Sequence, residues 1–436
     1  MKTKPKVSIV HGQNVSGTPC SYNEADLDAV YNLVKESIDL IGGISSVVQP
    51  GDRVLLKVNS TGEAAADRAA TTDPRVLQSV IRLIRDEAKP RYIKVMDRTG
   101  AARCTEQSFC ATGLKDAALN AGADDVINLE NEARVQVRIP KAMALTKDVI
   151  HIPKCLLEAD TLIYIPKLKA HKITSVSLTM KLSQGMLPWS DILKCHRADV
   201  DIKMVDLLRV IKPDLSIIDG LWAMQGQGPF SPFPDDVIKD LNLVIAGKDP
   251  VAVDSVASAV MGFEPMHDIN MVRAATMYGL GEGRLENIEV IGKSIEEVKR
   301  YFRRGSIDMS GLHPKIEAYY GSACTGCMAL TRTGLDPWLA DPERLKKLET
   351  VDRLTFVMGP RTNVPEKIYH NPPSAYAFIV GDCAAEHKDK GIFLPGCPGW
   401  YIGFIDFIGK SEEEIVNEYL YRYPNIEKPY EGGFLP

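Results

Sequence analysis

Short apolar runs alternate with segments of helical periodicity along most of the chain. The runs are rich in Val, Ile and Leu, as in 53–58, whereas the segments between them repeat apolar residues every three or four positions, as in 23–40. The predicted strands cover 7–10, 53–58, 92–96, 125–128, 161–165, 215–218, 241–246 and 288–291. The predicted helices cover 23–40, 73–87, 114–120, 250–261, 268–278 and a segment from 294.

This alternation predicts an α/β fold with mostly parallel sheets that helices cover on both faces. A polar segment at 303–314, with two glycines and a proline, interrupts the alternation. After it, strands are predicted at 316–320, 354–357 and 377–380, and helices at 341–348 and 411–421. We therefore expect two α/β domains, 1–305 and a smaller one at 306–436.

Charge and apolar content narrow the classes of partner. The chain has 52 Lys and Arg against 57 Asp and Glu, a net charge of −5, whereas a nucleic-acid binder needs a basic face. The apolar patch at 7–10 is too short for the core of a signal peptide. No apolar run reaches the ~18 residues of a membrane-spanning helix. We expect a cytoplasmic protein with no membrane segment and no nucleic-acid partner; the oligomeric state is not predicted.

The nine cysteines divide into two groups. Five are scattered through the first 200 residues, and four (Cys324, Cys327, Cys383 and Cys397) fall in the smaller domain beside glycines and prolines. A CxxC turn places two thiolates on one centre, and two more from distant loops complete the shell of a zinc ion or an iron–sulfur cluster. Zinc ribbons usually pair two CxxC motifs, so one CxxC with two single cysteines favours a cluster. Accidental buried thiols are the remaining alternative.

The cysteine motifs resemble those of a known family. The order CTGC, then GDCA after a strand, then PGCPG is similar to the proximal-cluster motifs of nickel–iron hydrogenase small subunits. The resemblance covers about 120 residues and implies one 4Fe-4S cluster on a flavodoxin-like α/β core, with ligands Cys324, Cys327, Cys383 and Cys397. Gly399 stands where that family has a second proline, and the cysteines and histidine for further clusters are absent. A hydrogenase partner is therefore not implied.

Polar side chains of the larger domain gather near predicted strand ends. Lys57 and Asn59 lie at the end of 53–58, and ligands of doubly wound sheets bind beyond the carboxyl ends of strands. Thr71 and Thr72 precede a predicted helix, where hydroxyls and free amides can hold an anion. These four residues are predicted to bind a cofactor or ligand. The alternative for the threonine segment is simple capping of the helix by Thr72 and Asp73.

A second group is cationic. Lys167, Lys169 and His171 follow the strand at 161–165 and share a face if the chain stays extended. Lys181 and His196 come later in the chain and are predicted to support them. Such a cluster indicates a carboxylate or phosphate ligand, or a lysine nucleophile of lowered pKa, and a solvated basic loop is the alternative.

Two acids and a glycine-rich loop complete the candidates. Asp219 follows the strand at 215–218, and Asp254 lies in the first turns of the helix at 250–261, so both could orient a substrate or act as acid or base. Gly226 and Gly228 belong to a GQGP loop that is predicted to bind a cofactor. The loop lacks the spacing and the following helix of a dinucleotide fingerprint.

These segments together resemble the domain-of-unknown-function family 362 (DUF362). The motifs VLLKVN, ATTDP, IPKLKAH, SLTMKLSQG, IIDG, GQGP and KDPVAVDS occur here in order, over about residues 5–300. The family often carries iron–sulfur motifs, in agreement with the cysteines. A weaker analogy of fold links it to the N-terminal domain of lactate racemase.

The resulting hypothesis is an iron–sulfur oxidoreductase whose 4Fe-4S cluster relays electrons to a small, anionic substrate in the larger domain. Lys167, Lys169 and His171 would bind or protonate the substrate, supported by Lys181 and His196. A flavin or another organic redox cofactor and a redox partner protein are further expectations. The alternatives are a lactate-racemase-like isomerase with a structural cluster and a non-catalytic electron carrier or metal-trafficking protein.

Overall fold

The chain folds into two compact units, and a short segment of the N-terminal part belongs to the second. The computed structural model describes residues 3–13, 15–62, 66–100, 104–144, 149–188, 191–192, 195–368, 374–399 and 406–422. The first unit comprises Met1–Pro188 and Asp201–Gly305, and the second Trp189–Val200 and Ser306–Glu431. The segment 189–200 therefore joins the second unit, although it precedes the domain boundary expected near residue 305.

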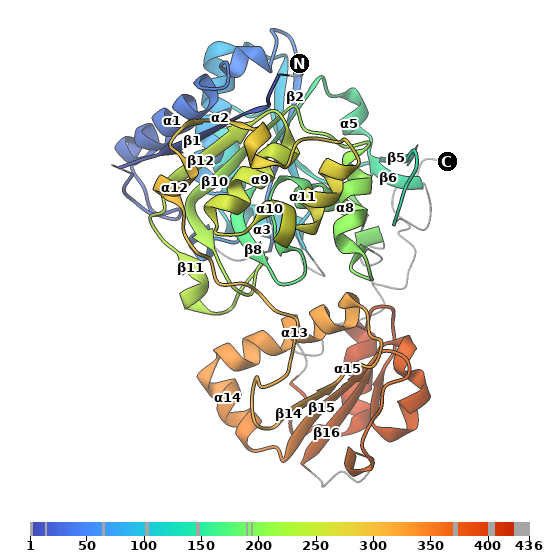
Figure 1. Ribbon diagram of the computed structural model, residues 1–436. Coiled ribbons are helices and arrows are strands. Elements are labelled where there is room, and N and C mark those ends of the chain that lie inside the picture. The colour runs from blue at the N-terminus through green and yellow to red at the C-terminus, as the bar shows by residue number, and fades with distance from the viewer. Residues whose placement is uncertain are drawn as a thin grey trace. The chain divides into compact units, whose positions relative to one another are not determined.

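One large sheet forms the centre of the first unit (Figure 1). Its strands lie in the order β13 (Glu289–Gly292), β1 (Lys6–His11), β12 (Leu243–Gly247), β10 (Leu215–Met224), β7 (Thr161–Ile165), β2 (Arg53–Val58), β3 (Tyr92–Asp97) and β4 (Asp125–Asn128). All neighbours on this path are parallel except β12, which runs antiparallel to both β1 and β10. The expected mostly parallel sheet is confirmed.

Further short strands extend the sheet beside β10. After Pro166 the chain continues from β7 into β8 (Lys167–His171), which also pairs with β10 in parallel. Two short strands, β9 (Ser175–Val176) and β11 (Val237–Ile238), pair antiparallel with β8 and β10 respectively. A separate hairpin joins β5 (Arg134–Arg138) to β6 (Val149–Pro153). The continuation into β8 carries Lys167, Lys169 and His171 past the end of β7.

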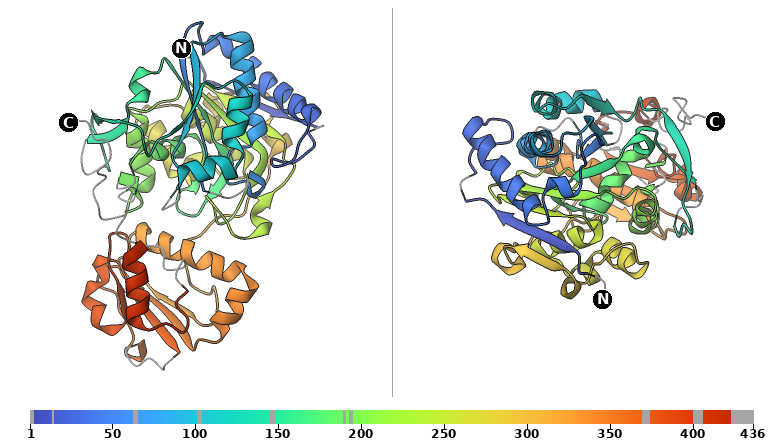
Figure 2. Two further views of the ribbon diagram at one scale, coloured as in Figure 1. Left: turned by 180° about the vertical axis from the view of Figure 1, so that it is seen from behind. Right: turned by 90° about the horizontal axis from the view of Figure 1, so that it is seen from above.

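Helices cover both faces of the large sheet, as the views from the front and from above show (Figures 1 and 2). One face carries α1 (Glu24–Asp39), α2 (Pro74–Glu87), α3 (Thr105–Ala111) and α4 (Leu114–Asn120). The other carries α6 (Thr179–Leu182), α9 (Pro250–Val260), α10 (Pro265–Asp268), α11 (Asn270–Met277) and α12 (Ile295–Val298). The remaining helices of this part are α5 (Cys155–Glu158) and α8 (Val200–Leu208).

The helix starts follow from their first residues. Asn23 caps α1 through a reciprocal pair of hydrogen bonds with Asp26, and Asp73 caps α2 ahead of Pro74 at the first helical position. The apolar stripes of these two helices are fully or almost fully buried against β1, β2 and β10 in one hydrophobic core. Burial of such stripes at ~25 cal/mol per Å² provides most of the stability of an amphipathic helix.

A four-stranded parallel sheet forms the second unit. Its strands lie in the order β14 (Ile316–Tyr319), β15 (Arg353–Met358), β16 (Ala375–Val380) and β17 (Ile392–Leu394). Helices α13 (Thr325–Ala340) and α14 (Pro342–Glu349) connect the first two strands, and α15 (Glu412–Arg422) packs against β17. The rings of Trp338, Phe356, Phe378 and Phe407 stack into one apolar layer on this sheet.

The strand order of the second unit differs from the flavodoxin-like order that the hydrogenase resemblance implied. A flavodoxin-like sheet places its first strand between its second and third. Here the four strands lie in chain order, because each connection steps to the next position on the same side of the growing sheet. The unit is α/β as expected, with a simpler topology.

Within the part of the chain that the structure describes, no helix is long and apolar enough to cross a membrane. The longest helices there, α1 and α13, have 16 residues each and carry charged side chains.

Candidate functional site

Lys57 and Asp97 form an ion pair at the carboxyl ends of two adjacent strands. Lys57 lies on β2 opposite Met96 of β3, and Asp97 is the next residue along β3. The Lys57 ammonium donates to the Asp97 carboxylate and to the Val58 carbonyl, at 2.9 Å for the latter. Burial lowers the pKa of Lys57 and raises that of Asp97, while their mutual attraction opposes both shifts. The pair is held without solvent, since both side chains are almost fully buried.

A second buried pair lies on the neighbouring strands. Lys167 of β8 donates from Nζ to Asp219 Oδ2 of β10 at 3.0 Å, and both side chains are completely buried. The same oxygen accepts the backbone N–H of Asp73 at 2.6 Å, while Oδ1 accepts that of Leu221 at 3.2 Å. Burial raises the pKa of Asp219, and the Lys167 charge lowers it. Asp219 thereby joins β8, which we call the lysine strand, to the start of α2.

Lys169 has no carboxylate partner within hydrogen-bond reach among the described residues. Its Nζ donates to the Thr61 hydroxyl at 2.8 Å and to the Ala70 carbonyl at 2.7 Å. Burial, together with the positive charge of Lys181, lowers its pKa to about 7. Lys169 is therefore largely neutral above neutral pH, unlike an ordinary lysine with a pKa of ~10.4.

Asp254 holds the short helix that carries Lys181. Its two carboxylate oxygens accept the backbone N–H groups of Thr179 at 2.8 Å and Met180 at 2.9 Å, at the start of α6. Burial raises the pKa of Asp254 to about 7, against the lowering effect of these hydrogen bonds. Lys181 bonds to Gln184 one turn later and is 8% exposed. Asp254 thus acts on the site by positioning α6.

Asn59 and Thr72 are engaged in holding the loop between β2 and α2. Asn59 accepts the Lys167 backbone N–H through its side chain at 2.8 Å, and its own N–H donates to the Thr72 hydroxyl at 2.9 Å. That hydroxyl donates to the Ile165 carbonyl at 2.7 Å. The neighbouring Thr71 hydroxyl is buried without a hydrogen-bond partner among the described residues. Thr71 thus keeps a buried polar atom that Asn59 and Thr72 do not use.

His171 lies at the end of the lysine strand and bonds to its own turn. Its Nδ1 accepts the backbone N–H groups of Ile173 at 3.1 Å and Thr174 at 3.3 Å, and the residue is 2% exposed. An Nδ1 that accepts carries no proton, so any ring proton of the neutral form is on Nε2. The turn between β8 and β9 thus orients the ring.

The GQGP loop packs closely against the same strand. A Cβ on Gly228 would lie 1.8 Å from the Ala170 carbonyl oxygen, and one on Gly226, whose φ is +64°, would lie 2.2 Å from Asp236. The Gly228 carbonyl accepts the Lys172 N–H at 3.1 Å. Gly228 is therefore needed for close packing against the backbone of β8, and Gly226 for packing against the Asp236 side chain, while their cofactor role stays a prediction.

The structure brings together most, not all, of the predicted residues. Lys57, Lys167 and Lys181 lie within electrostatic reach of Lys169, as does Asp97. We call these four lysines the lysine cluster. His196 belongs to the second unit, where its carbonyl accepts the hydroxyl of Thr325 at 3.2 Å, so it is not part of the lysine cluster within the first unit. Its place in the chain, between the two parts of the first unit, gave no sign of this.

The four cysteines of the second unit lie within electrostatic reach of one another. Burial raises the pKa of Cys327 to about 12; the Gly399 N–H, which donates to Cys327 Sγ at 3.3 Å, lowers it, and the thiols of Cys324, Cys397 and Cys383 raise it. The pKa of Cys397 is raised by burial and again by Cys383 and Cys324. Three segments of the unit, the CxxC turn and the loops of Cys383 and Cys397, therefore bring four thiols toward one region.

Glycines leave the room that these thiols occupy. Gly381 has a φ of +89°, and a Cβ there would lie 2.7 Å from Cys327 Sγ. A Cβ on Gly399 would lie 2.6 Å from Val380 and 2.9 Å from the Gly381 nitrogen. Among the described residues, no group of three or more His, Cys, Asp or Glu side chains is arranged to hold a metal ion.

Arg197 approaches the cysteines from the segment 189–200. Its Nε donates to the Cys397 carbonyl at 2.9 Å, and its charge lowers the pKa of Cys397. Thr325, between the two cysteines of the CxxC motif, donates its hydroxyl to the Arg197 carbonyl at 3.1 Å. The segment 189–200 therefore contacts both the CxxC turn and the loop of Cys397, and links the two.

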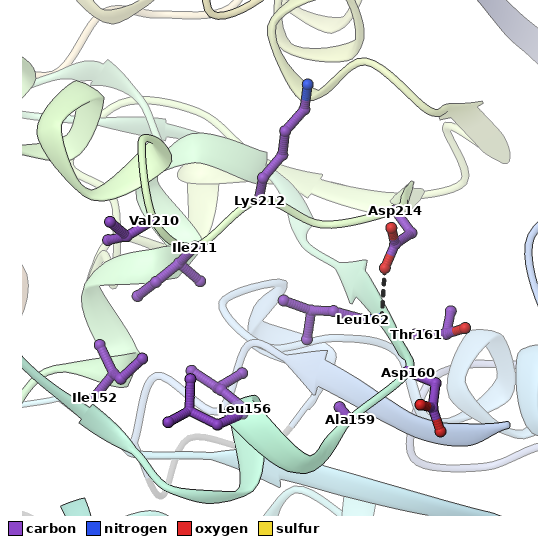
Figure 3. Close-up of a pocket in the computed structure, with 11 residues that line it drawn as sticks. Ile152, Leu156, Ala159, Asp160, Thr161, Leu162, Val210, Ile211, Lys212 and Asp214 are labelled. Atoms are coloured by element: carbon purple, nitrogen blue, oxygen red, sulfur yellow. Dashed lines mark hydrogen bonds between the residues drawn. The ribbon is translucent and has the colours of Figure 1, made fainter. Parts of the chain in front are cut away.

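Two cavities lie elsewhere on the first unit. One, of about 170 Å³, lies at the amino end of β7 and is shown in Figure 3, where Ile152, Leu156 and Ile211 face it and Lys212 extends away. The Asp214 carboxylate at its rim accepts the Leu162 N–H at 2.9 Å. Another, of about 320 Å³, lies beside β3 and β4. Neither cavity is lined by Lys57, Lys167, Lys169 or Lys181.

The sequence did not predict several residues that contact the lysines of the first unit and the cysteines of the second. Asp97 directly follows the predicted strand 92–96, the same signal that singled out Lys57. Thr61 and Ala70, the acceptors for Lys169, carry no signal, because a hydroxyl and a backbone carbonyl are ordinary in any loop. Arg197 is likewise distant in sequence from the cysteines that it contacts.

Comparison with known proteins supports the family resemblance in part. Residues 54–259 match the family model described as Domain of unknown function (DUF362). The thylakoid-associated protein sll1697 of Synechocystis sp. is 27% identical over 241 residues, which cover 52% of this chain and 68% of that protein. The matched range includes the lysine cluster and ends ahead of the four cysteines.

A solved structure is also similar over part of the chain. The lactate racemase apoprotein from Thermoanaerobacterium thermosaccharolyticum aligns with a TM-score of 0.34 and 11% identity, over 60% of this chain and 58% of that one. This chain thus spans less than two thirds of that protein.

Proposed function

We propose that the chain is an iron–sulfur oxidoreductase, with one 4Fe-4S cluster in the second unit and a site for a small anion in the first. The observation that carries the cluster is the gathering of four thiols around Cys327, with the Gly399 N–H donating to its sulfur. The observation that carries the anion site is the gathering of buried lysines, with Lys57, Lys167 and Lys181 within electrostatic reach of Lys169.

The residues of the second unit fit a four-iron cluster. A single zinc ion holds each sulfur at ~2.3 Å. A four-iron cluster takes four thiolates, each on a different iron, and the second unit brings four thiols within electrostatic reach of one another. Backbone N–H groups and a positive charge stabilise such an anionic cluster, and here Gly399 and Arg197 would supply them. Cys324, Cys327, Cys383 and Cys397 would be the ligands.

The residues of the first unit fit an anion. Lys57, Lys167, Lys169 and Lys181 are all buried in the first unit; Lys57 pairs with Asp97 and Lys167 with Asp219, whereas Lys169 donates to uncharged acceptors. Asp254 accepts two backbone N–H groups of α6. A carboxylate or phosphate ligand would interact favourably with the buried cations, since a buried charge is stabilised by a partner of opposite sign.

The chain's own residues would then act as follows. Lys181 would bind the anionic group, Lys169 would lie beside it as a largely neutral amine, and the Lys57–Asp97 pair shares a proton that can move to or from the substrate. Asp254 and Asp219 position α6 and the lysine strand. When bound, the cluster supplies one-electron transfer. A flavin or another organic redox cofactor and a redox partner protein belong to this proposal as the source of two-electron chemistry.

The isomerase with a structural cluster is the second candidate. The observation that favours it is Lys169, whose neutral acceptors suit a base or nucleophile that needs no electron transfer. A cluster that changes oxidation state at physiological potentials favours the oxidoreductase, and a redox-silent cluster favours the isomerase.

Anaerobic purification with iron and sulfide assays tests the cluster. We expect iron and sulfide in the protein and broad absorption near ~400 nm from thiolate-to-iron charge transfer. Cys383→Ser should lose most of the iron, whereas Cys155→Ser, on α5 of the first unit, should keep it. Zinc without that absorption, or unchanged iron in Cys383→Ser, would overturn the assignment.

A further inference from the structure

We propose that Lys169 is the nucleophile of the lysine cluster, and that it condenses with the carbonyl carbon of a small 2-oxo acid to form an imine. The proposal deepens the anion site and rests on it, because it names the substrate class: a carboxylate for the neighbouring cations and an adjacent carbonyl for the amine. It rests on three features of the surroundings of Lys169.

The first feature is the number of hydrogen-bond acceptors. Lys169 Nζ has two among the described residues, the Thr61 hydroxyl oxygen at 2.8 Å and the Ala70 carbonyl at 2.7 Å. A neutral amine has two N–H groups and one lone pair, whereas an ammonium has three N–H groups. The Thr61 hydroxyl donates to the same Ala70 carbonyl at 2.9 Å, so it offers its oxygen to the amine. The contacts therefore satisfy the neutral form and leave its lone pair unused.

The second feature is the contrast with the neighbouring lysines. Lys57 pairs with Asp97, and Lys167 pairs with Asp219, so a carboxylate stabilises the charged form of each. Lys169 is equally buried, and both of its acceptors are uncharged. Of these three lysines, Lys169 is the one whose environment holds the amine ready to attack.

The third feature is the surrounding charge. Lys181, Lys167 and Lys57 all repel a proton on Lys169, and Asp97 attracts it more weakly than burial and Lys181 disfavour it. Cationic neighbours are a known means of activating a lysine, and the same cations can bind the carboxylate of an oxo acid. The buried hydroxyl of Thr71, directly after Ala70, has no partner among the described residues and is available to a polar ligand.

The step balances without any further reactant. The Lys169 nitrogen forms a bond to the carbonyl carbon, and the bond from that carbon to its oxygen breaks. The two amine hydrogens and the carbonyl oxygen leave as one water molecule. No electron is gained or lost, so the step proceeds with the cluster in either oxidation state.

Borohydride trapping tests the proposal on the full-length protein. The anaerobically purified protein is incubated separately with pyruvate, glyoxylate, oxaloacetate and 2-oxoglutarate, then reduced with sodium borohydride and mapped by peptide mass spectrometry. We expect at least one of these acids to label the peptide that contains Lys169. Acetone, which has the carbonyl without the carboxylate, should leave this peptide unlabelled.

Matched variants separate the reaction from folding. Lys169→Arg keeps a long basic side chain without the primary amine and Lys169→Met keeps the length of the side chain; both should lose the label, whereas Lys212→Arg, at an exposed position, should keep it. Far-UV circular dichroism and iron content of each preparation show that it is folded. No label with any of the four acids, or equal labelling of the Lys169 variants, would overturn the proposal. Loss of the cluster with labelling intact would overturn the proposed redox function alone.

Discussion

Lys167 Nζ lies 3.0 Å from Asp219 Oδ2, and neither side chain is exposed to solvent. The pair joins β8 to β10, and Asp219 also accepts the backbone N–H of Asp73 at the start of α2. It therefore fixes the lysine strand against two neighbouring elements. The contribution of this ion pair to the free energy of unfolding can be measured without an activity assay.

We expect the loss of either partner to be costly and the loss of both to be less than additive. Lys167→Met or Asp219→Asn alone should lower the free energy of unfolding by ~3–5 kcal/mol, because one buried polar group is left uncompensated. The double variant should lose less than the sum. Urea unfolding of the four proteins measures the coupling. Arg53→Gln, which removes the exposed pair with Asp160, should cost at most ~1 kcal/mol; an equal cost at both pairs would contradict this account.

Gly381→Ala should prevent cluster assembly. A Cβ there would lie 2.7 Å from Cys327 Sγ and would also strain a backbone with φ of +89°. Gly409→Ala is a matched control, since Gly409 has φ of +83° and nothing within 4 Å of its Cβ position. Iron content should fall in Gly381→Ala and stay near the wild-type value in Gly409→Ala. Equal iron in the two variants would mean that Gly381 makes no room for the site.

Asp254 should make stability depend on pH. Its pKa is about 7 in the folded protein, against 3.8 for an ordinary aspartate, so the folded state retains a proton that the unfolded state releases between these values. Stability should therefore fall by a few kcal/mol as pH rises from ~4 to ~7. Asp254→Asn should lack this part of the slope in urea unfolding. Asp28→Asn, at an exposed position, should keep it, and an unchanged slope in Asp254→Asn would exclude the effect.

Arg197→Gln should shift the reduction potential of the proposed cluster to more negative values. Removing a positive charge beside Cys397 makes the addition of an electron less favourable. Potentiometric titration followed by EPR spectroscopy measures the shift, and iron content shows that the cluster is retained. Arg344→Gln, on the exposed side of α14, should leave the potential unchanged. A potential that is the same in Arg197→Gln and wild type would contradict this role.

Labelling of Lys169 should depend on pH near neutrality. Its pKa of about 7 is lowered by burial and by Lys181, so the reactive neutral amine increases as pH rises from ~6 to ~8. Lysines with a pKa of ~10.4 should react far less over the same range. The initial rate of imine trapping at each pH gives the midpoint. Lys181→Met should move this midpoint upward, because a repelling charge is lost; a midpoint above ~9 in the wild type would argue against activation.

Local sequence patterns were sufficient for most of the large sheet and its helices. The predicted runs at 53–58, 125–128 and 161–165 are β2, β4 and β7 with the predicted bounds. The reversed direction of β12 was not predictable, since a buried run reads the same in either direction. Residues 134–138 were missed because their side chains alternate between charged and apolar on a half-exposed hairpin. The helix α13 was missed because it contains Gly326, Gly334 and Pro337, which disfavour a helix.

The candidate sites were predictable only where a residue type was unusual for its surroundings. A charged residue within or directly after an apolar run is unusual, and this pattern singled out Lys57, Lys167 and Lys169. The partners that decide their protonation (Asp97, Thr61 and the Ala70 carbonyl) come from other strands and loops. Asp254 was visible, while its contact with α6 depends on tertiary packing. Distances of this kind arise from the fold and leave no local mark.

The path of segment 189–200 has a consequence for how the chain folds during synthesis. This segment leaves the ribosome about a hundred residues before the remainder of the second unit. Arg197 therefore cannot meet the Cys397 carbonyl until 397 residues have been made, by which time the strands of the first unit are complete. Because domains generally fold as units during synthesis, the first unit would fold while the segment 189–200 still lacks its contacts with the second unit. The contact between Arg197 and the Cys397 carbonyl would then form last, and it would fix the segment 189–200 in place.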